Sequence, residues 1–190
     1  MAGQVRTGQV RKDISIMKNS IIFMDIDGVI NNYLYCERMK NEPKNPNLPL
    51  LTEMDLSMMK RIVRLATETN SDIVLSSSWK AVWNYKKADI GKANMQKMFD
   101  YVGIHIIDTT PDLTDGRAKE IKQWLDEHPT VTHFVSLDDD YPESYYKKAG
   151  IPNHTIHTKY WCINESQGGF QEKHYQKALE ILKTKYKTDV

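Results

Sequence analysis

Short apolar runs alternate with segments of helical periodicity along most of this chain, and this alternation limits its possible folds more than any other feature. Such a repeat is typical of α/β proteins, in which helices join the strands of a parallel sheet, and it argues against a helical bundle or a β-sandwich. The apolar runs that we expect to be strands are residues 21–26, 73–75, 103–108, 131–140 and 154–158. The sequence therefore predicts an α/β fold with a mainly parallel central sheet.

The segments between these runs carry the signals of helices. A helix is predicted to begin at Thr52, because Thr52 and Asp55 resemble a capping box. Apolar residues then recur at helical spacing and are expected to face the core: Met54, Met58, Ile62 and Leu65. Three more helices are predicted, over residues 80–102, 117–127 and 170–183.

The length of the chain, 190 residues, predicts one domain. We place this domain at residues 19–190 and expect residues 1–18, which are polar and mildly basic, to form a flexible arm. Residues 31–51 contain three prolines and are expected to be a largely irregular insert. This insert is too short to be a domain of its own.

Composition and charge narrow the class of protein. A content of 40% hydrophobic and 27% charged residues is typical of a globular protein, and the net charge of only +1 makes nonspecific binding to nucleic acid less favoured. No apolar run approaches the ~20 residues of a membrane span, and the first residues lack the hydrophobic region of a signal peptide. We therefore expect a cytoplasmic protein in which the two cysteines, Cys36 and Cys162, are reduced.

Polar residues follow three of the predicted strands at the point where each strand ends. Asp25 and Asp27 follow the first, Ser76–Ser78 the second, and Asp138–Asp140 the fourth. The carboxyl ends of parallel strands lie along one edge of the sheet, where α/β proteins bind their ligands. We expect these residues to form one site.

The residue types at this edge indicate phosphate chemistry that depends on a metal. Converging carboxylates repel one another unless a cation is present, and Mg²⁺ prefers oxygen ligands and commonly binds substrate phosphate as well. Serine hydroxyls can donate to phosphate oxygens, and either Arg117 or Lys119, at the start of a helix, can neutralise further charge. Asp25 as a nucleophile would form an aspartyl-phosphate.

Four motifs in sequence order resemble those of the haloacid dehalogenase (HAD) superfamily. They are "FMDIDGVIN", "IVLSSSW", "GRAKEI" and "FVSLDDD", and together they extend the similarity from about Ile21 to the last helix. The resemblance implies a three-layer, Rossmann-like HAD fold with a short insert in place of a large cap domain. The "SSSW" and "LDDD" stretches also resemble, on fewer residues, the HAD domain associated with bacterial RNA-repair proteins.

The same resemblance implies roles for individual residues. In the phosphatases of the superfamily with a D-x-D motif, the first aspartate attacks phosphorus and the second moves the proton, which implies these roles for Asp25 and Asp27. Phosphate binding is implied for Ser76, with Ser77 as the alternative, and for Arg117, with Lys119 as the alternative. The implied Mg²⁺ ligands are Asp25, the main-chain carbonyl of Asp27, and Asp138 or Asp139.

Each of these signals also has a structural interpretation. An Asp-Gly pair is often only a turn, and a serine triplet or an aspartate run is often an exposed loop. His154 and His157 could indicate a second metal, but surface or strand positions are the favoured interpretation. Four aromatic residues near the motifs could line the entrance to the site or pack in the core: Tyr33, Tyr35, Trp79 and Trp83.

The predicted site has at most a small cap, and open sites suit phosphate groups on large molecules. Because the net charge is small, we expect a phosphoprotein as the substrate, with phosphotyrosine fitting an aromatic entrance. The alternatives are a phosphatase for nucleic-acid ends of the RNA-repair type and a catalytically silent phosphate-binding module. The sequence predicts no oligomeric state.

Overall fold

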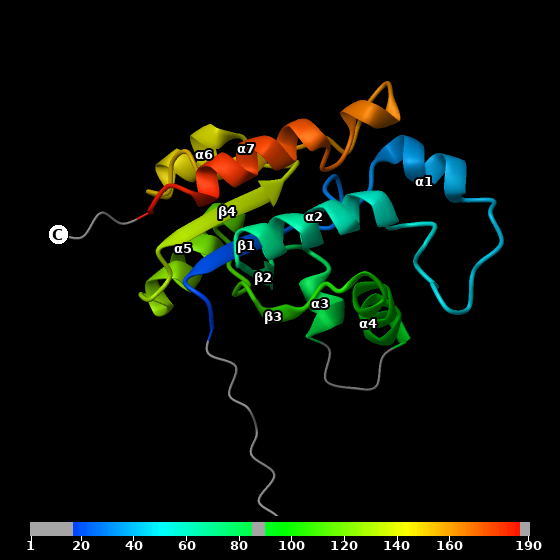
Figure 1. Ribbon diagram of the computed structural model, residues 1–190, viewed down its shortest axis with the longest axis horizontal. Helices are drawn as coiled ribbons and strands as arrows, with labels where there is room; N and C mark the ends of the chain where they lie inside the picture. Colours follow the sequence, from blue (N-terminus) through cyan, green and yellow to red (C-terminus); the bar gives the residue numbers. More distant parts are fainter. Residues whose placement is uncertain (1–16, 85–89, 187–190) are drawn as a thin grey trace, which may run out of the picture.

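A five-stranded, entirely parallel sheet forms the centre of the protein (Figure 1). The structure is a computed structural model that describes residues 17–84 and 90–186. The strands lie in the order β3-β2-β1-β4-β5. Their bounds are β1 (Ser20–Met24), β2 (Asp72–Leu75), β3 (Ile106–Thr109), β4 (His133–Asp138) and β5 (Thr155–His157). The predicted strands are thus all present: β4 and β5 are shorter than their apolar runs, β2 begins one residue before its run, and β1 and β3 are shifted by one or more residues.

Helices cover both faces of this sheet. Ile22 and Met24 of β1 belong to one core with side chains of α2 (Leu56–Glu68), α4 (Ile90–Val102) and α7 (Glu172–Leu182). Ile21 and Phe23, which alternate with them, belong to a second core with α5 (Arg117–Glu127) and α6 (Glu143–Lys148). Burial of both faces explains why β1 reads as a continuous apolar run. The predicted three-layer α/β fold is confirmed.

The helix predicted to begin at Thr52 begins later. The N-cap of α2 is Asp55, whose carboxylate accepts hydrogen bonds from the backbone N–H groups of Ser57 and Met58 at 2.6 and 3.4 Å. The proposed capping box of Thr52 and Asp55 is therefore wrong. An aspartate can cap a helix by itself, and its carboxylate here satisfies N–H groups of the first turn.

The continuous helix predicted over residues 80–102 is also wrong. A short helix, α3 (Lys80–Trp83), ends at a turn at Asn84, and α4 begins at Ile90. Residues 85–89 lie outside the described part of the chain, as do residues 1–16 of the predicted arm.

The insert at residues 31–51 is more ordered than its prolines indicated. It contains α1 (Tyr33–Met39), which is capped by Asn32 through a 3.0 Å hydrogen bond from the backbone N–H of Tyr35. The remainder of the insert is turns and one isolated bridge. In Figure 1, α1 lies beside the segment that leads from β5 into α7, and the Arg38–Glu165 ion pair joins the two. No helix in the described residues is long and apolar enough to cross a membrane.

Candidate active site

The register of the sheet brings three predicted site residues to the same level. Met24 of β1 pairs with Leu75 of β2 and with Leu137 of β4. The ladder continues one residue further, because the Asp25 N–H donates to Leu137 O at 3.1 Å and the Ser76 N–H donates to Met24 O at 2.8 Å. Asp25 therefore lies between Ser76 and Asp138 at the carboxyl edge of the central strand.

Asp25 is almost completely buried and is held by donors on both carboxylate oxygens. Its Oδ1 accepts from the backbone N–H of Ile26 at 2.7 Å, and its Oδ2 accepts from Nη1 of Arg117. Burial raises the pKa of the Asp25 carboxyl to about 6; the Arg117 guanidinium opposes this rise, and the negative charge of Asp138 adds to it. Asp25 is thus a buried, ionisable carboxylate in a fixed position.

Arg117 joins Asp25 to Asp138. The same Nη1 that donates to Asp25 also donates to Asp138 Oδ2 at 2.8 Å, and Arg117 is the first residue of α5. Strand alternation explains the meeting, because Asp25 follows Phe23 by two residues and so points toward the layer that contains α5. Within the described part of the chain, Arg117 uses Nη1 as the donor in both hydrogen bonds. The guanidinium has further N–H donors that a bound phosphate could accept from.

Asp138 is fully engaged by protein groups. Its Oδ2 also accepts from the Tyr146 hydroxyl at 2.8 Å, and its Oδ1 accepts from the backbone N–H groups of Asp140 and Tyr141 at 2.8 and 3.2 Å. The side chain is completely buried. The arrangement makes Asp138 an anchor for Arg117.

Lys119, the alternative to Arg117, points elsewhere. Its ammonium group forms an exposed ion pair with Asp115, one helical turn earlier, at 2.7 Å. Of the two predicted cations, the structure brings only Arg117 to Asp25.

Asp27 lies just beyond the strand and has neutral partners. Its Oδ2 accepts from the indole N–H of Trp79 at 2.8 Å, and its Oδ1 accepts from the side-chain amide of Asn31 at 2.9 Å. Asn31 is itself fixed by donating to Glu53 O and accepting from the Gly28 N–H. Asp27 is half-buried and lines a cleft.

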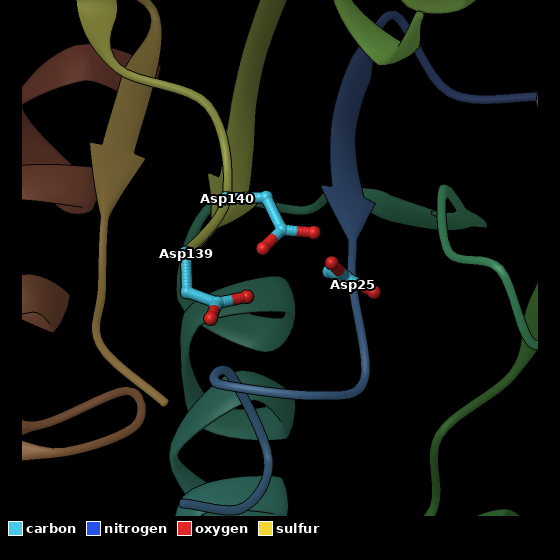
Figure 2. Close-up of side chains that lie close together, drawn as sticks. All are labelled: Asp25, Asp139 and Asp140. Atoms are coloured by element: carbon cyan, nitrogen blue, oxygen red, sulfur yellow. The ribbon is translucent and has the colours of Figure 1, made fainter. Parts of the chain in front are cut away.

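Three carboxylates converge at the edge of the sheet, as Figure 2 shows: Asp25, Asp139 and Asp140. One oxygen from each lies within 4.8 Å of the others. Gly28, at φ +68°, makes room for this group, because a Cβ there would come within 2.1 Å of Asp139 Cγ. Burial, together with the negative charges of Asp140, Asp25 and Asp138, raises the pKa of Asp139 to about 7.

This oxygen set fits a hard divalent cation such as Mg²⁺. Mutual repulsion of carboxylates is the situation that a bound cation relieves, and the distances allow one ion to reach all three. The predicted ligands Asp25 and Asp139 are members of the group. Asp140 is an addition that the sequence reasoning did not assign, and Asp138 and the Asp27 carboxylate lie outside the group.

The two candidate serines face different partners. The Ser77 hydroxyl lowers the pKa of Asp25 by hydrogen bonding to its carboxylate. The Ser76 hydroxyl instead accepts a long hydrogen bond from Thr110 at 3.5 Å, next to the buried Lys80–Glu120 ion pair. Ser77 is therefore the serine that interacts with Asp25, whereas the sequence favoured Ser76 for binding phosphate.

Most of the other residues that the sequence singled out contact the core or the insert and not the carboxylate group. His154 is buried, stacks on Phe134 and is hydrogen-bonded to the Phe134 carbonyl through Nδ1, so a surface position is wrong for it; His157 is exposed. Tyr35 donates to Leu51 O and Met54 O inside the insert, and Trp83 packs on the core near Phe99. Cys36 and Cys162 are free thiols.

Sequence reasoning missed Asn31 and Tyr146, and it gave no specific contact to Asp140, which it had placed at this edge, or to Trp79, which it had placed near the motifs. Asn31 and Trp79 orient Asp27, and Tyr146 orients Asp138. Asp140 and Trp79 stand within or beside the motifs, so proximity in sequence was a usable signal. Tyr146 lies in α6 without any motif, and only the fold brings it to Asp138.

A comparison with family models found a match over most of the chain. The model described as the HAD domain in Swiss Army Knife RNA repair proteins matches residues 21–174, a range that begins in β1 and ends in α7. It includes all the candidate site residues described above. No curated protein and no solved structure matches the chain.

Proposed function

Because the chain belongs to the family of HAD domains in Swiss Army Knife RNA repair proteins, we propose that it is a phosphomonoester hydrolase that works through a phosphorylated Asp25. Membership of the HAD superfamily supports a phosphatase in general. The observation that carries the proposal is the position of Asp25, which is buried, bound to Arg117 and adjacent to the carboxylates of Asp139 and Asp140.

In the first step, an oxygen of Asp25 attacks phosphorus and the bond from phosphorus to the leaving oxygen breaks. Asp27, in its protonated form, gives its proton to that oxygen. Arg117 and the Ser77 hydroxyl are placed to donate to the phosphate oxygens while negative charge shifts onto them. The products of this step are the free alcohol and an aspartyl-phosphate at Asp25.

In the second step, Asp27, now a carboxylate, takes a proton from water as the water oxygen attacks phosphorus. The bond from phosphorus to Asp25 breaks, which releases inorganic phosphate and restores both aspartates. The neutral donors Trp79 and Asn31 hold Asp27 in place in both steps. Asp25, Asp139 and Asp140 are the residues that would hold Mg²⁺, which when bound supplies positive charge to offset that of the phosphate.

The test of this proposal is hydrolysis of p-nitrophenyl phosphate with and without Mg²⁺. We expect activity that requires the metal and that falls by at least about 1,000-fold in Asp25→Asn. Lys119→Ala, which alters an exposed cation two residues from Arg117, is the matched control and should retain activity.

The absence of hydrolysis with any divalent metal would instead support a catalytically silent phosphate-binding module. Equal activity in the unmodified protein and Asp25→Asn would contradict the role of Asp25. Circular dichroism of each variant separates loss of chemistry from loss of folding.

Two classes of macromolecule are candidates for the substrate. The small net charge supports a phosphoprotein, including phosphotyrosine, and the description of the family supports the end of a nucleic acid. A panel of phosphopeptides and of oligonucleotides with 3′- or 5′-phosphates distinguishes the classes by kcat/KM. Hydrolysis confined to the oligonucleotides would reverse the preference for protein that the sequence alone indicated.

A further inference from the structure

A cleft of about 460 Å³ leads away from the candidate active site. Its lining includes the candidate proton-transfer residue, two carboxylates of the proposed metal group, and the segment that follows β5: Asp27, Asp139, Asp140, His157, Thr158, Lys159, Tyr160 and Trp161. The Thr158 N–H donates to Asp138 O at 2.9 Å, so this segment starts at the catalytic edge and runs outward from it. A group that leaves phosphorus at Asp25 therefore has this cleft available to it.

An aromatic cluster stands at the outer end of this segment. The rings of Tyr33 and Trp161 are 4.6 Å apart at an interplanar angle of 35°, and Tyr160 meets Trp161 edge-on at 5.2 Å. The side chain of Trp161 is nevertheless 71% exposed. Trp and Tyr are enriched at interfaces, and ligand pockets are lined mainly by hydrophobic and aromatic side chains.

The backbone holds this cluster in place from two sides. The Tyr33 N–H, at the start of α1, donates to Tyr160 O at 3.0 Å, and the Gly169 N–H donates to Lys159 O at 2.9 Å. Gly168 packs so closely that an added Cβ would come within 2.6 Å of Asn32 Cβ and of Cys162 Sγ. The exposed ring is therefore mounted on a fixed surface, which lowers the entropy cost of binding.

The lining between the carboxylates and the rings is polar. His157, Thr158 and Lys159 occupy it, and Thr158 is a buried residue whose hydroxyl has no hydrogen-bond partner within the described part of the protein. In phosphotyrosine the ring is bonded directly to the ester oxygen, so an apolar wall next to the phosphate would suit it. A polar stretch followed by an aromatic surface suits a sugar between phosphate and ring.

We propose that Trp161, backed by Tyr33, is a stacking subsite for the base of the nucleotide that carries the phosphate. This inference rests on the proposed function and assigns the substrate class of the same cleft, a nucleic-acid end. Stacking on an aromatic side chain is tolerant of base identity, because every base has a π-face. Lys159 is the cation in the lining with a fixed positive charge, so binding should depend only weakly on salt.

The experiment compares kcat/KM for an oligonucleotide with a 3′-phosphate, the same oligonucleotide with an abasic terminal sugar, and glycerol phosphate. In Trp161→Ala we expect the ratio of kcat/KM for the base-bearing oligonucleotide to that for glycerol phosphate to fall roughly 5- to 100-fold. Trp161→Phe should restore most of the ratio. The abasic oligonucleotide should show little dependence on residue 161.

Two exposed hydrophobic residues provide matched controls. Ile163 is 92% exposed on the same segment and Tyr101 is 59% exposed on α4, and neither lines the cleft. Ile163→Ala and Tyr101→Ala should leave the ratio unchanged. An equal change in all three alanine variants, or none in Trp161→Ala, would overturn the subsite.

Phosphotyrosine peptide is the competing substrate. If this peptide has the higher kcat/KM and its hydrolysis, not that of the oligonucleotide, depends on Trp161, the assignment to a nucleotide is wrong. Trp161 would then bind the ring of phosphotyrosine. If none of the substrates, glycerol phosphate included, is hydrolysed, the proposed function fails and not only the subsite.

A binding experiment tests the subsite without catalysis. It compares the quenching of Trp fluorescence by the 3′-phosphorylated oligonucleotide in Asp25→Asn and in Asp25→Asn that also carries Trp161→Phe. Quenching that does not depend on Trp161 would overturn it.

Discussion

Asp25 and Asp27 are two residues apart, yet their carboxylates have opposite surroundings. Asp25 is buried and contacts a guanidinium that a second buried carboxylate also binds. Asp27 is half-buried and receives hydrogen bonds from an indole and an amide, both neutral. The Arg117 guanidinium offsets part of the burial that raises the pKa of Asp25, whereas Asp27 lines the cleft, where a bound group can reach it. The same loop thus supplies two chemically different aspartates.

Removing the acid at Asp27 should have the largest effect on this division of roles. We expect Asp27→Asn to lower kcat for glycerol phosphate by roughly 100- to 10,000-fold, the usual range for general acid–base catalysis. The rate of the first step should fall much less for p-nitrophenyl phosphate, because p-nitrophenolate leaves without needing a proton. Rapid-quench measurement of alcohol release for both substrates checks this, and equal losses would contradict the assignment.

Removing the charge at Arg117 is the next test. Arg117→Ala should lower kcat/KM for p-nitrophenyl phosphate by about 100- to 1,000-fold, because donors to the phosphate are lost. The variant also leaves Asp25 and Asp138 uncompensated in a buried position and should be less stable. Arg117→Lys keeps the charge and should recover part of both properties. Lys119→Ala should retain activity, and a larger loss there than in Arg117→Ala would reverse the assignment.

Tyr146→Phe tests the support behind Arg117. The hydroxyl donates to Asp138 Oδ2 and lies 3.0 Å from Ser136 Oγ, so its removal takes one hydrogen bond from each of two buried groups, although Asp138 Oδ2 keeps the bond from Arg117. We expect the free energy of unfolding to fall by about 1–3 kcal/mol. Urea denaturation measures this change. An unchanged urea midpoint would show that the Tyr146 hydroxyl does not stabilise the pair of Arg117 and Asp138.

Trp79→Phe should give the smallest effect, because it removes one of the two neutral donors to Asp27. We expect kcat for glycerol phosphate to fall roughly 3- to 10-fold, the kinetic equivalent of one hydrogen bond. Trp83→Phe is the matched control, since Trp83 packs near Phe99 away from Asp27. A similar fall in both variants would mean that packing, not the indole N–H, matters.

The sequence predicted the elements whose signals are local. Asp25 and Asp138 were placed at one edge because parallel strands end together, and α5 was predicted to span Arg117 to Glu127, as it does. The choice of Arg117 over Lys119 could not be made, because it depends on which residue of the first turn of α5 faces β1. Strand alternation directs Asp25 toward α5, and only the packed layers show this.

The run Asp138–Asp140 shows why the members of the carboxylate group were predicted only in part. Ser136 and Asp138 are two residues apart in β4, so they share a face, where Tyr146 contacts both. Asp139 and Asp140 follow the end of the strand and turn back to Asp25. The three consecutive aspartates therefore have different partners because β4 ends at Asp138. Residue propensities alone do not predict where that strand ends.

The central claim is that Asp25 carries the phosphoryl group, and Asp27→Asn allows it to be trapped. With p-nitrophenyl phosphate and Mg²⁺, this variant should release one equivalent of p-nitrophenol per protein and then stop, because no base activates water. Proteolysis and mass spectrometry should locate a phosphoryl group on Asp25. A phosphoryl group on Ser76 or Ser77, or continued turnover with no phosphorylated residue, would contradict the mechanism.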